Sequence, residues 1–342
     1  MPNEIQEKFF SVAEDIMRLD PWSRDMEPIA LCPQEGTDHM MVVVFIKDGD
    51  ERVIRFIRNR RALRTWLEAM HRDGEGNMLA LISQVEDDYN EVVQDPDQMN
   101  GYEKKQNEER DMPIVCRKKR PGQPLVSFSN TELEGLLPYL RALRKVLALD
   151  HQNDAPRYIA SEKVLLQAYH FENGKVEALA PIELRPFERQ QTNKTYLDEF
   201  TLARLARTAT DDEQYELFYF YLPMVHQHEG RSYFPMTAFL VNLNTGVINW
   251  SEVLMPKPGW EEALLRKLSQ YFFEEEIVPG RILCARLNWY ESFAEDMRRS
   301  YIPFEKISKT YIGDELTESY VKMAHLKGRH FEQLLIPLEP EK

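Results

Sequence analysis

Apolar and polar residues alternate along this chain of 342 residues with two different periods. Where apolar residues recur at every third or fourth position, the spacing predicts helices with one buried face. The stretch at 130–149 is the clearest, because Ser129 or Asn130 can cap its start and Arg144 lies toward its end. The same spacing predicts helices over 3–19, 60–71, 130–149, 196–207, 259–274, 289–300 and 314–325.

Short runs of apolar and β-branched residues, many of them bounded by turn residues, predict strands. Asp48-Gly49-Asp50 and Asn244-Thr245-Gly246 suit tight turns, so each is expected to join two strands in a hairpin. By contrast, 86–111 is rich in Asp, Glu, Asn and Gln and is predicted to be a long polar loop. The predicted strands are 29–32, 40–47, 52–58, 78–83, 113–117, 164–171, 176–179, 215–225, 233–241, 247–253, 281–286 and 304–307.

These elements predict an α+β protein built from two modules, each a mainly antiparallel sheet covered by helices. The polar, proline-containing segment 151–157 separates them, which gives modules at 1–152 and 158–342. Near the C-terminus, strands and helices alternate, so a parallel β-α-β run is expected there. Both halves share an order of elements, which fits either an ancient duplication or coincidence.

Several short segments resemble parts of uncharacterised bacterial two-module proteins. The segment Asp111–Arg120, with Pro121-Gly122 and the long helix after it, is similar to the end of their N-terminal module. The segment 279–283, together with Tyr290-Glu291 and Ile302-Pro303-Phe304, is similar to the tail of their second module. Both modules are known only as domains of unknown function. The resemblance therefore implies a bacterial, cytoplasmic, two-module protein and supplies no activity.

Charge and cysteine content argue against a nucleic-acid-binding, a membrane-associated and a secreted, disulfide-bonded protein. The formal net charge of −14 argues against general attraction to nucleic acid or to an anionic membrane surface. The three cysteines are far apart and form no CxxC pair, which favours a reducing cytoplasm over a disulfide-bonded secreted protein. No apolar run approaches the roughly 20 residues that span a bilayer, and no signal peptide is read at the N-terminus.

Well-specified catalytic motifs are absent from the sequence. It contains no GxGxxG, no GxxxxGK[ST], no GxSxG and no HExxH, so neither a nucleotide loop nor a nucleophile elbow is indicated. His226 and His228 could share one face of a strand and hold a metal ion, although a polar hairpin tip explains them more simply. We therefore expect no cofactor, and keep a metal-dependent hydrolase with a non-standard site as an alternative to a non-catalytic protein.

Basic residues gather in two segments of this acidic chain. Six arginines lie within thirteen residues that contain no acid, from Arg52 to Arg64, and a second basic patch spans 117–120. Arginine presents a planar fork that suits phosphate or carboxylate, so the two patches would form an anion-binding surface if they meet in space. The alternative, which we favour, is pairing with nearby acids inside the fold. The candidate anion-binding residues are Arg55, Arg58, Arg61, Arg64, Lys118 and Arg120.

Taken together, the sequence favours a non-catalytic binding or interaction protein of the bacterial cytoplasm. Its partner is expected to be another protein or a small anionic ligand. Nucleic acid is a less favoured ligand because of the net charge, and the sequence does not determine the oligomeric state.

Overall fold

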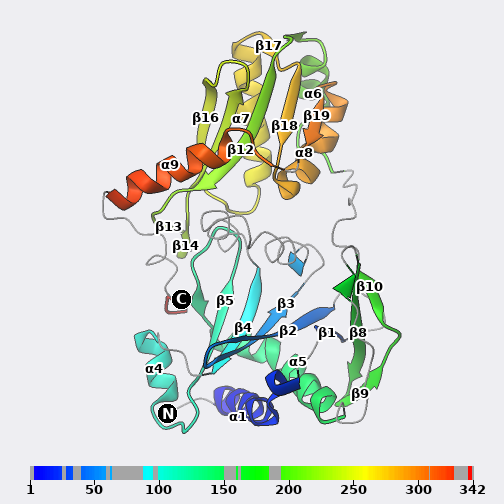
Figure 1. Ribbon diagram of the computed structural model, residues 1–342, viewed down its shortest axis with the longest axis vertical. Coiled ribbons are helices and arrows are strands. Elements are labelled where there is room, and N and C mark those ends of the chain that lie inside the picture. The colour runs from blue at the N-terminus through cyan, green and yellow to red at the C-terminus, as the bar shows by residue number, and fades with distance from the viewer. Residues whose placement is uncertain are drawn as a thin grey trace. The chain divides into compact units, whose positions relative to one another are not determined.

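The computed structural model confirms the α+β class and divides into two compact units (Figure 1). It describes residues 4–24, 28–33, 40–58, 62–63, 88–94, 99–149, 159–160, 163–184, 194–307, 309–326 and 338–340. Unit 1 comprises Met1–Glu75, Ser83–Phe187 and Leu335–Lys342, and unit 2 comprises Gly76–Ile82 and Glu188–Leu334. Most of the predicted helix at 60–71 and the predicted strand at 78–83 lie outside the described residues.

Unit 1 is a sheet with the two long helices, α1 and α5, packed on one face. Its strands follow the order β10-β8-β1-β2-β3-β4-β5-β6, and β7 and β9 also pair with β8. The helical elements are α1 (Glu4–Leu19), η1 (Pro21–Arg24), α4 (Gly101–Asn107) and α5 (Asn130–Leu149). The strands are β1 (Ile29–Cys32), β2 (Met41–Asp48), β3 (Glu51–Ile57), β4 (Tyr89–Gln94), β5 (Ile114–Lys119), β6 (Val126–Ser127), β7 (Ile159–Ala160), β8 (Lys163–Glu172), β9 (Lys175–Ala178) and β10 (Ile182–Leu184).

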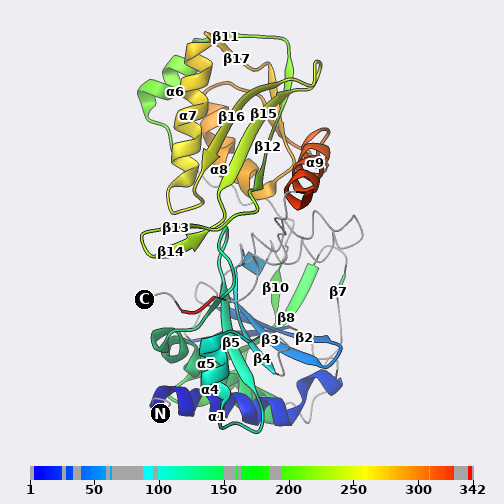
Figure 2. The same cartoon turned by 90° about the vertical axis from the view of Figure 1, so that its left-hand side faces the viewer.

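The main core of unit 1 lies between this sheet and the helices α1 and α5, which contact each other (Figures 1 and 2). The apolar face predicted for α1 is buried, and α5 spans the predicted residues 130–149. Alternate residues of β3 point to opposite faces, so Phe56 enters this core while Arg55 lies on the other side. The periodic pattern therefore identified the elements that pack.

The hairpin of β8 and β9 belongs to unit 1. The sequence placed it in the second module, after the polar segment 151–157, which lies outside the described residues. In the structure β8 pairs in parallel with β1, from Ile29 opposite Gln167 to Cys32 opposite His170. β2 pairs with β1 on its other side, so β1 is an interior strand of the sheet, and all four of its residues are buried. The two compact units therefore divide the chain differently from the predicted modules 1–152 and 158–342.

The prediction of a loop over 86–111 is wrong for two stretches of it. β4 forms the middle of the β3-β4-β5 part of the sheet, and its Asn90 and Glu91 are buried although they are polar. Asn100 then begins α4 with a capping box, in which Asn100 and Glu103 each bond the other's backbone N–H. Neither element has an apolar period, because polar side chains occupy two of the four buried positions of β4 and both buried positions of α4.

Glu103 of α4 and Arg117 of β5 form a buried ion pair. Arg117 Nε lies 3.1 Å from Glu103 Oε1 and Arg117 Nη2 lies 3.3 Å from Glu103 Oε2, so the contact is bidentate. Their side chains are 0% and 8% exposed for Glu103 and Arg117. The pair fixes α4 on the sheet in place of apolar packing.

Removing one partner of this pair should be costly. We expect Glu103→Ala to lower the free energy of unfolding by about 3–5 kcal/mol, because Arg117 keeps its charge in a buried position. Glu4→Ala is the matched control, since its pair with Lys8 is 82% exposed on the glutamate side. Urea unfolding followed by circular dichroism measures both variants, and equal losses would contradict a structural role for the buried pair.

Unit 2 contains a mixed sheet with helices on both faces. The helices are α6 (Glu199–Leu205), α7 (Trp260–Glu274), α8 (Leu287–Arg299) and α9 (Gly313–Leu326). The strands are β11 (Ala209–Thr210), β12 (Gln214–Tyr221), β13 (His226–His228), β14 (Arg231–Tyr233), β15 (Met236–Asn242), β16 (Ile248–Leu254), β17 (Ile277–Val278), β18 (Arg281–Cys284) and β19 (Phe304–Lys306).

The main sheet of unit 2 has the order β16-β15-β12-β18-β19. β16, β15 and β12 are antiparallel, whereas β12, β18 and β19 are parallel, so this sheet is less antiparallel than predicted. The predicted β-α-β run is confirmed as β18-α8-β19. On β12, Tyr219 stacks on α8 and Phe220 contacts α9, which places the two helices on opposite faces (Figure 2).

Glu216 attaches the start of α9 to the centre of this sheet. Its fully buried carboxylate accepts hydrogen bonds from the backbone N–H groups of Tyr311 (3.1 Å) and Ile312 (2.8 Å). Gly313 follows, and a Cβ at this residue would lie 2.8 Å from Cγ of Phe218, so only glycine fits without movement. Burial raises the pKa of Glu216, although the backbone N–H groups oppose the shift.

Because the pKa of Glu216 is raised in the folded state, its contribution to stability is present below about pH 4.3 and is lost as the pH rises through the folded pKa. We compare the unfolding free energy of the wild type with that of Glu216→Gln. The difference, wild type minus variant, should decrease as the pH is raised from about 4 to about 7. Urea unfolding at both pH values checks this. A difference that rises with pH would show that the carboxylate is stabilised in its charged form.

Among the described residues, no helix is long and apolar enough to cross a membrane.

Candidate functional site

The chain leaves the parallel strands β12 and β18 in opposite directions. After β12 it runs through β13 and β14 to β15, which pairs with β12 on one side. After β18 it forms α8 and then β19, which pairs with β18 on the other side. In open α/β sheets, ligands bind in the crevice where neighbouring parallel strands part in this way, beyond their carboxyl ends. This end of β12 and β18 is therefore the first place to look for a site in unit 2.

Arg286 lies at this point, two residues after the end of β18. It is the N-cap residue of α8 and is only 7% exposed. Among the described residues its guanidinium has no hydrogen bond and no ion pair, and its Cζ lies 5.6 Å from the centroid of the Tyr219 ring. A buried charge is normally paired, because desolvation costs several kcal/mol. Arg286 has no such partner among the described residues, and its side-chain nitrogens are not among the fully buried nitrogen atoms that lack a hydrogen bond, so they keep contact with solvent.

Aromatic rings form the wall beside Arg286. Tyr219 and Trp289 stack with centroids 4.2 Å apart, and Trp260 lies 5.5 Å from Trp289. Tyr219 and Trp289 are almost fully buried and hold each other in place, so they are not free to stack on a planar ligand. They provide a rigid, apolar surface, next to which a charge interacts more strongly than it does in water.

The first turn of α8 adds a second source of positive potential. The helix has thirteen residues, no side chain caps its first N–H groups, and no acid lies in its first turn. Free N–H groups and the helix dipole, equivalent to roughly half a unit charge, favour an anion at this end. Arg298 and Arg299 lie in the last turn, where cations complement the dipole. Tyr219, Arg286, Trp289 and the first turn of α8 are called the Arg286 site below.

Cys284 is the one thiol close to this site along the chain. It is fully buried, and burial raises its pKa to about 12, so the group is a neutral thiol near pH 7. Its Sγ lies 3.5 Å from the carbonyl oxygen of Arg286. Because a thiolate is the nucleophilic form, the site is suited to holding an anion and not to cysteine chemistry.

The two predicted basic patches begin on different strands, the first on β3 and the second on β5, and β4 lies between these strands. Arg55 on β3 reaches Glu91 on β4 (3.3 Å) and lies over the ring of Tyr89 (3.9 Å from Cζ to the centroid). Glu91 lies opposite Arg117 on β5 in the sheet register. Cations from both patches therefore flank a buried carboxylate on the strand that the sequence analysis missed.

Two further predicted residues also reach carboxylates. Lys118 pairs with Glu132 at the start of α5 (2.7 Å), and Arg120 pairs with Asp88 (3.2 Å). Arg58 is exposed, and its charge acts on Asp88, but burial outweighs both arginines and raises the Asp88 pKa. Arg61 and Arg64 lie outside the described residues. Anion binding by the six candidate residues stays a prediction. Three of them, Arg55, Lys118 and Arg120, form ion pairs with acidic side chains of unit 1.

The histidines of the predicted metal motif lie in a short hairpin. His226 and His228 alternate along β13, and His228 Nε2 lies 3.1 Å from Nζ of Lys257 and 3.4 Å from an oxygen of Glu229. Across the part of the chain that the structure describes, no group of three or more His, Cys, Asp and Glu side chains is placed to hold a metal ion. A metal site at His226 and His228 would need a ligand from elsewhere.

The second compact unit contains the part of the chain that matches a known family. Residues 201–320 match a family model described as "Domain of unknown function (DUF6930)". No curated protein and no solved structure matches the chain. The resemblance of the second module to a domain of unknown function is thereby confirmed, and the matched residues contain the whole Arg286 site.

Sequence reasoning missed Arg286 because it assigned this residue to a strand. The predicted strand ran from 281 to 286, whereas β18 ends at Cys284 and Arg286 begins α8. A weak signal was present, since an arginine between a strand and a helix of a parallel β-α-β run lies at the carboxyl edge of the sheet. Its lack of a partner depends on residues distant in sequence and could not be foreseen.

If Arg286 serves a ligand and not the fold, its charge should be dispensable for folding. We expect Arg286→Met to leave the free energy of unfolding unchanged or to raise it slightly, because a largely buried side chain loses its charge and no described hydrogen bond or ion pair is broken. Arg117→Met is the matched control and should lower that free energy by about 3–5 kcal/mol, because Glu103 loses its partner. Urea unfolding without added anions compares them. Equal destabilisation by both would assign Arg286 a structural role.

Proposed function

We propose that this protein is a non-catalytic binding protein of the bacterial cytoplasm that takes up a small anionic ligand at the Arg286 site. The observation that carries the proposal is Arg286, a largely buried residue whose guanidinium has no hydrogen bond or ion pair among the described residues. A phosphate or carboxylate group would supply the missing charge and accept bidentate hydrogen bonds from the guanidinium fork.

Other buried acids support binding over catalysis. Glu103 holds a guanidinium, and Glu216 and Asp296 accept backbone N–H groups that fix loops of unit 2. A general acid or base needs a side chain that can exchange its proton with a substrate, and these carboxylates are engaged inside the fold. A cytoplasmic location is in keeping with three buried free cysteines.

Titration with inorganic phosphate tests the proposal. Isothermal titration calorimetry at low salt should detect binding to the wild type, and Arg286→Gln should weaken it by at least about tenfold, since a hydrogen bond to a charged group contributes about 1.5–3 kcal/mol. Arg281→Gln is the matched control, because Arg281 begins β18, the strand that precedes Arg286, but is half-exposed and paired with Glu305. Binding that is absent, or equally weakened by both variants, would reject the Arg286 site.

The metal-dependent hydrolase remains the alternative. It predicts stoichiometric metal in protein purified without chelator, with loss of that metal in the double variant His226→Ala, His228→Ala. Elemental analysis of the two proteins separates it from the binding protein, because phosphate binding at Arg286 requires no metal.

A further inference from the structure

We propose that the β6 edge of unit 1 is a docking site for an extended, proline-flanked segment of a partner protein, and that residues 338–340 of this chain occupy it as a resident competitor. This surface belongs to unit 1, so the proposal goes beyond the anion site of unit 2 and does not depend on it.

The β6 edge is the side of β6, the last strand of the sheet, that does not face β5. One side of β6 pairs with β5, through Ser127 opposite Arg117. On the other side, the N–H of Leu338 donates to the carbonyl of Leu125 and the N–H of Ser127 donates to the carbonyl of Leu338, both at 2.8 Å. Leu338 thereby forms a parallel bridge with Val126, which is the hydrogen-bond pattern of strand addition.

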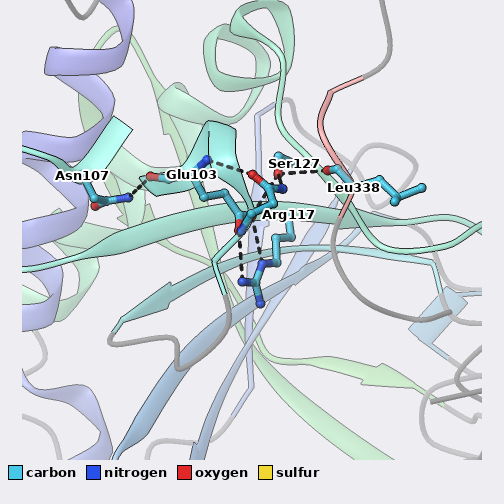
Figure 3. Close-up of polar contacts among 6 residues, drawn as sticks. Glu103, Asn107, Arg117, Ser127 and Leu338 are labelled. Carbon is cyan, nitrogen blue, oxygen red and sulfur yellow. Dashed lines mark hydrogen bonds and ion pairs between the residues drawn. The ribbon is translucent and has the colours of Figure 1, made fainter. Parts of the chain in front are cut away.

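The groups that receive Leu338 are fixed by contacts within residues 100–127. Ser127 Oγ lies 3.1 Å from the carbonyl oxygen of Leu338 and 2.9 Å from Glu103 Oε1, and it accepts a hydrogen bond from Asn100 Nδ2 at 2.8 Å (Figure 3). Glu103 is in turn held by Arg117 (Figure 3). The buried ion pair of Glu103 and Arg117 keeps the hydroxyl of Ser127, which is itself buried, in one place. The edge is therefore preorganised before any segment binds, which lowers the entropic cost of docking.

The resident segment is held mainly by its backbone. Leu338 and Glu339 are exposed, so the docked residues bury little apolar surface. Contacts made by main-chain atoms do not depend on the identity of the side chain. Another extended segment can consequently replace residues 338–340 without a change in the edge.

The sequence around Leu338 defines the chemistry of a suitable partner. Pro337 and Pro340 flank the bridge, and proline has no N–H with which to extend a strand ladder. A residue that precedes proline is also biased toward extended backbone. A segment of this kind is already extended when free, can make a single bridge and then stops. The central residue must keep its N–H, because that group donates to Leu125.

The test uses the full chain with Leu338→Pro, which removes the N–H that donates to Leu125 and leaves the β6 edge unchanged. The probe is a fluorescein-labelled peptide with the sequence of residues 335–342, LIPLEPEK. Fluorescence anisotropy should show binding to the variant at least about tenfold tighter than to the wild type, because the resident segment lowers the fraction of open sites. The same peptide with proline in place of Leu338 should not bind. Adding Ser127→Ala to the variant should weaken binding of the probe.

Three outcomes would overturn the proposal: no binding of the probe to a folded variant, equal binding to variant and wild type, or equal binding of both peptides. If the variant fails to fold, hydrogen exchange of the wild type supplies the answer. Excess unlabelled peptide should then speed exchange at Leu338, and unchanged exchange would reject displacement. Phosphate binding by the same proteins reports on the Arg286 site alone, so the two proposals fail separately.

Discussion

A charge removed from water needs a compensating group, and this constraint organises the interior of both units. In unit 1, Arg55, Glu91 and Arg117 lie in one row across β3, β4 and β5, so opposite charges alternate along the row. Glu103 joins this row from α4 and holds Arg117. In unit 2, Glu216 and Asp296 are fully buried and are compensated by backbone N–H groups. Arg286 is the buried arginine for which the described residues supply no such group.

How far the sequence predicts the fold depends on which force holds each element. α1 and α5 pack through apolar faces, so their spacing alone located them, and the strand predicted around the aromatic residues of β12 has a buried side chain at every position but the first. β4 and α4 carry buried polar residues, Glu91 on β4 and Glu103 on α4 among them, and a buried glutamate looks the same in sequence as a solvated one. Both elements were therefore assigned to a loop. The pairing of β8 with β1 joins residues more than a hundred positions apart, and no local pattern encodes it.

The candidate sites follow the same division. The arginines around Arg55 were found from their density, but the acids that pair with them lie on β4 and were invisible to a search for clusters of one sign. Arg286 is a single arginine in an ordinary segment, and its significance comes from the absence of a described partner. The search for clustered arginines in the sequence thus found cations that pair with acids of the fold. The cation proposed to hold a ligand was found from the structure, because it has no partner among the described residues.

The two proposed binding surfaces use different physical means. At the Arg286 site the protein supplies charge beside a rigid aromatic wall, so affinity comes from electrostatics in a water-poor environment and specificity from the geometry of the guanidinium fork. At the β6 edge the protein supplies main-chain groups held by a buried ion pair, so affinity comes from backbone hydrogen bonds and specificity from the extended conformation of the partner. Both surfaces are built on rigid elements of the fold, and in both the stabilising pair or stack lies directly behind the group that meets the ligand. Arg117 is thus paired and fixes Ser127 through Glu103, whereas Arg286 has no partner among the described residues and is the group proposed to meet the ligand.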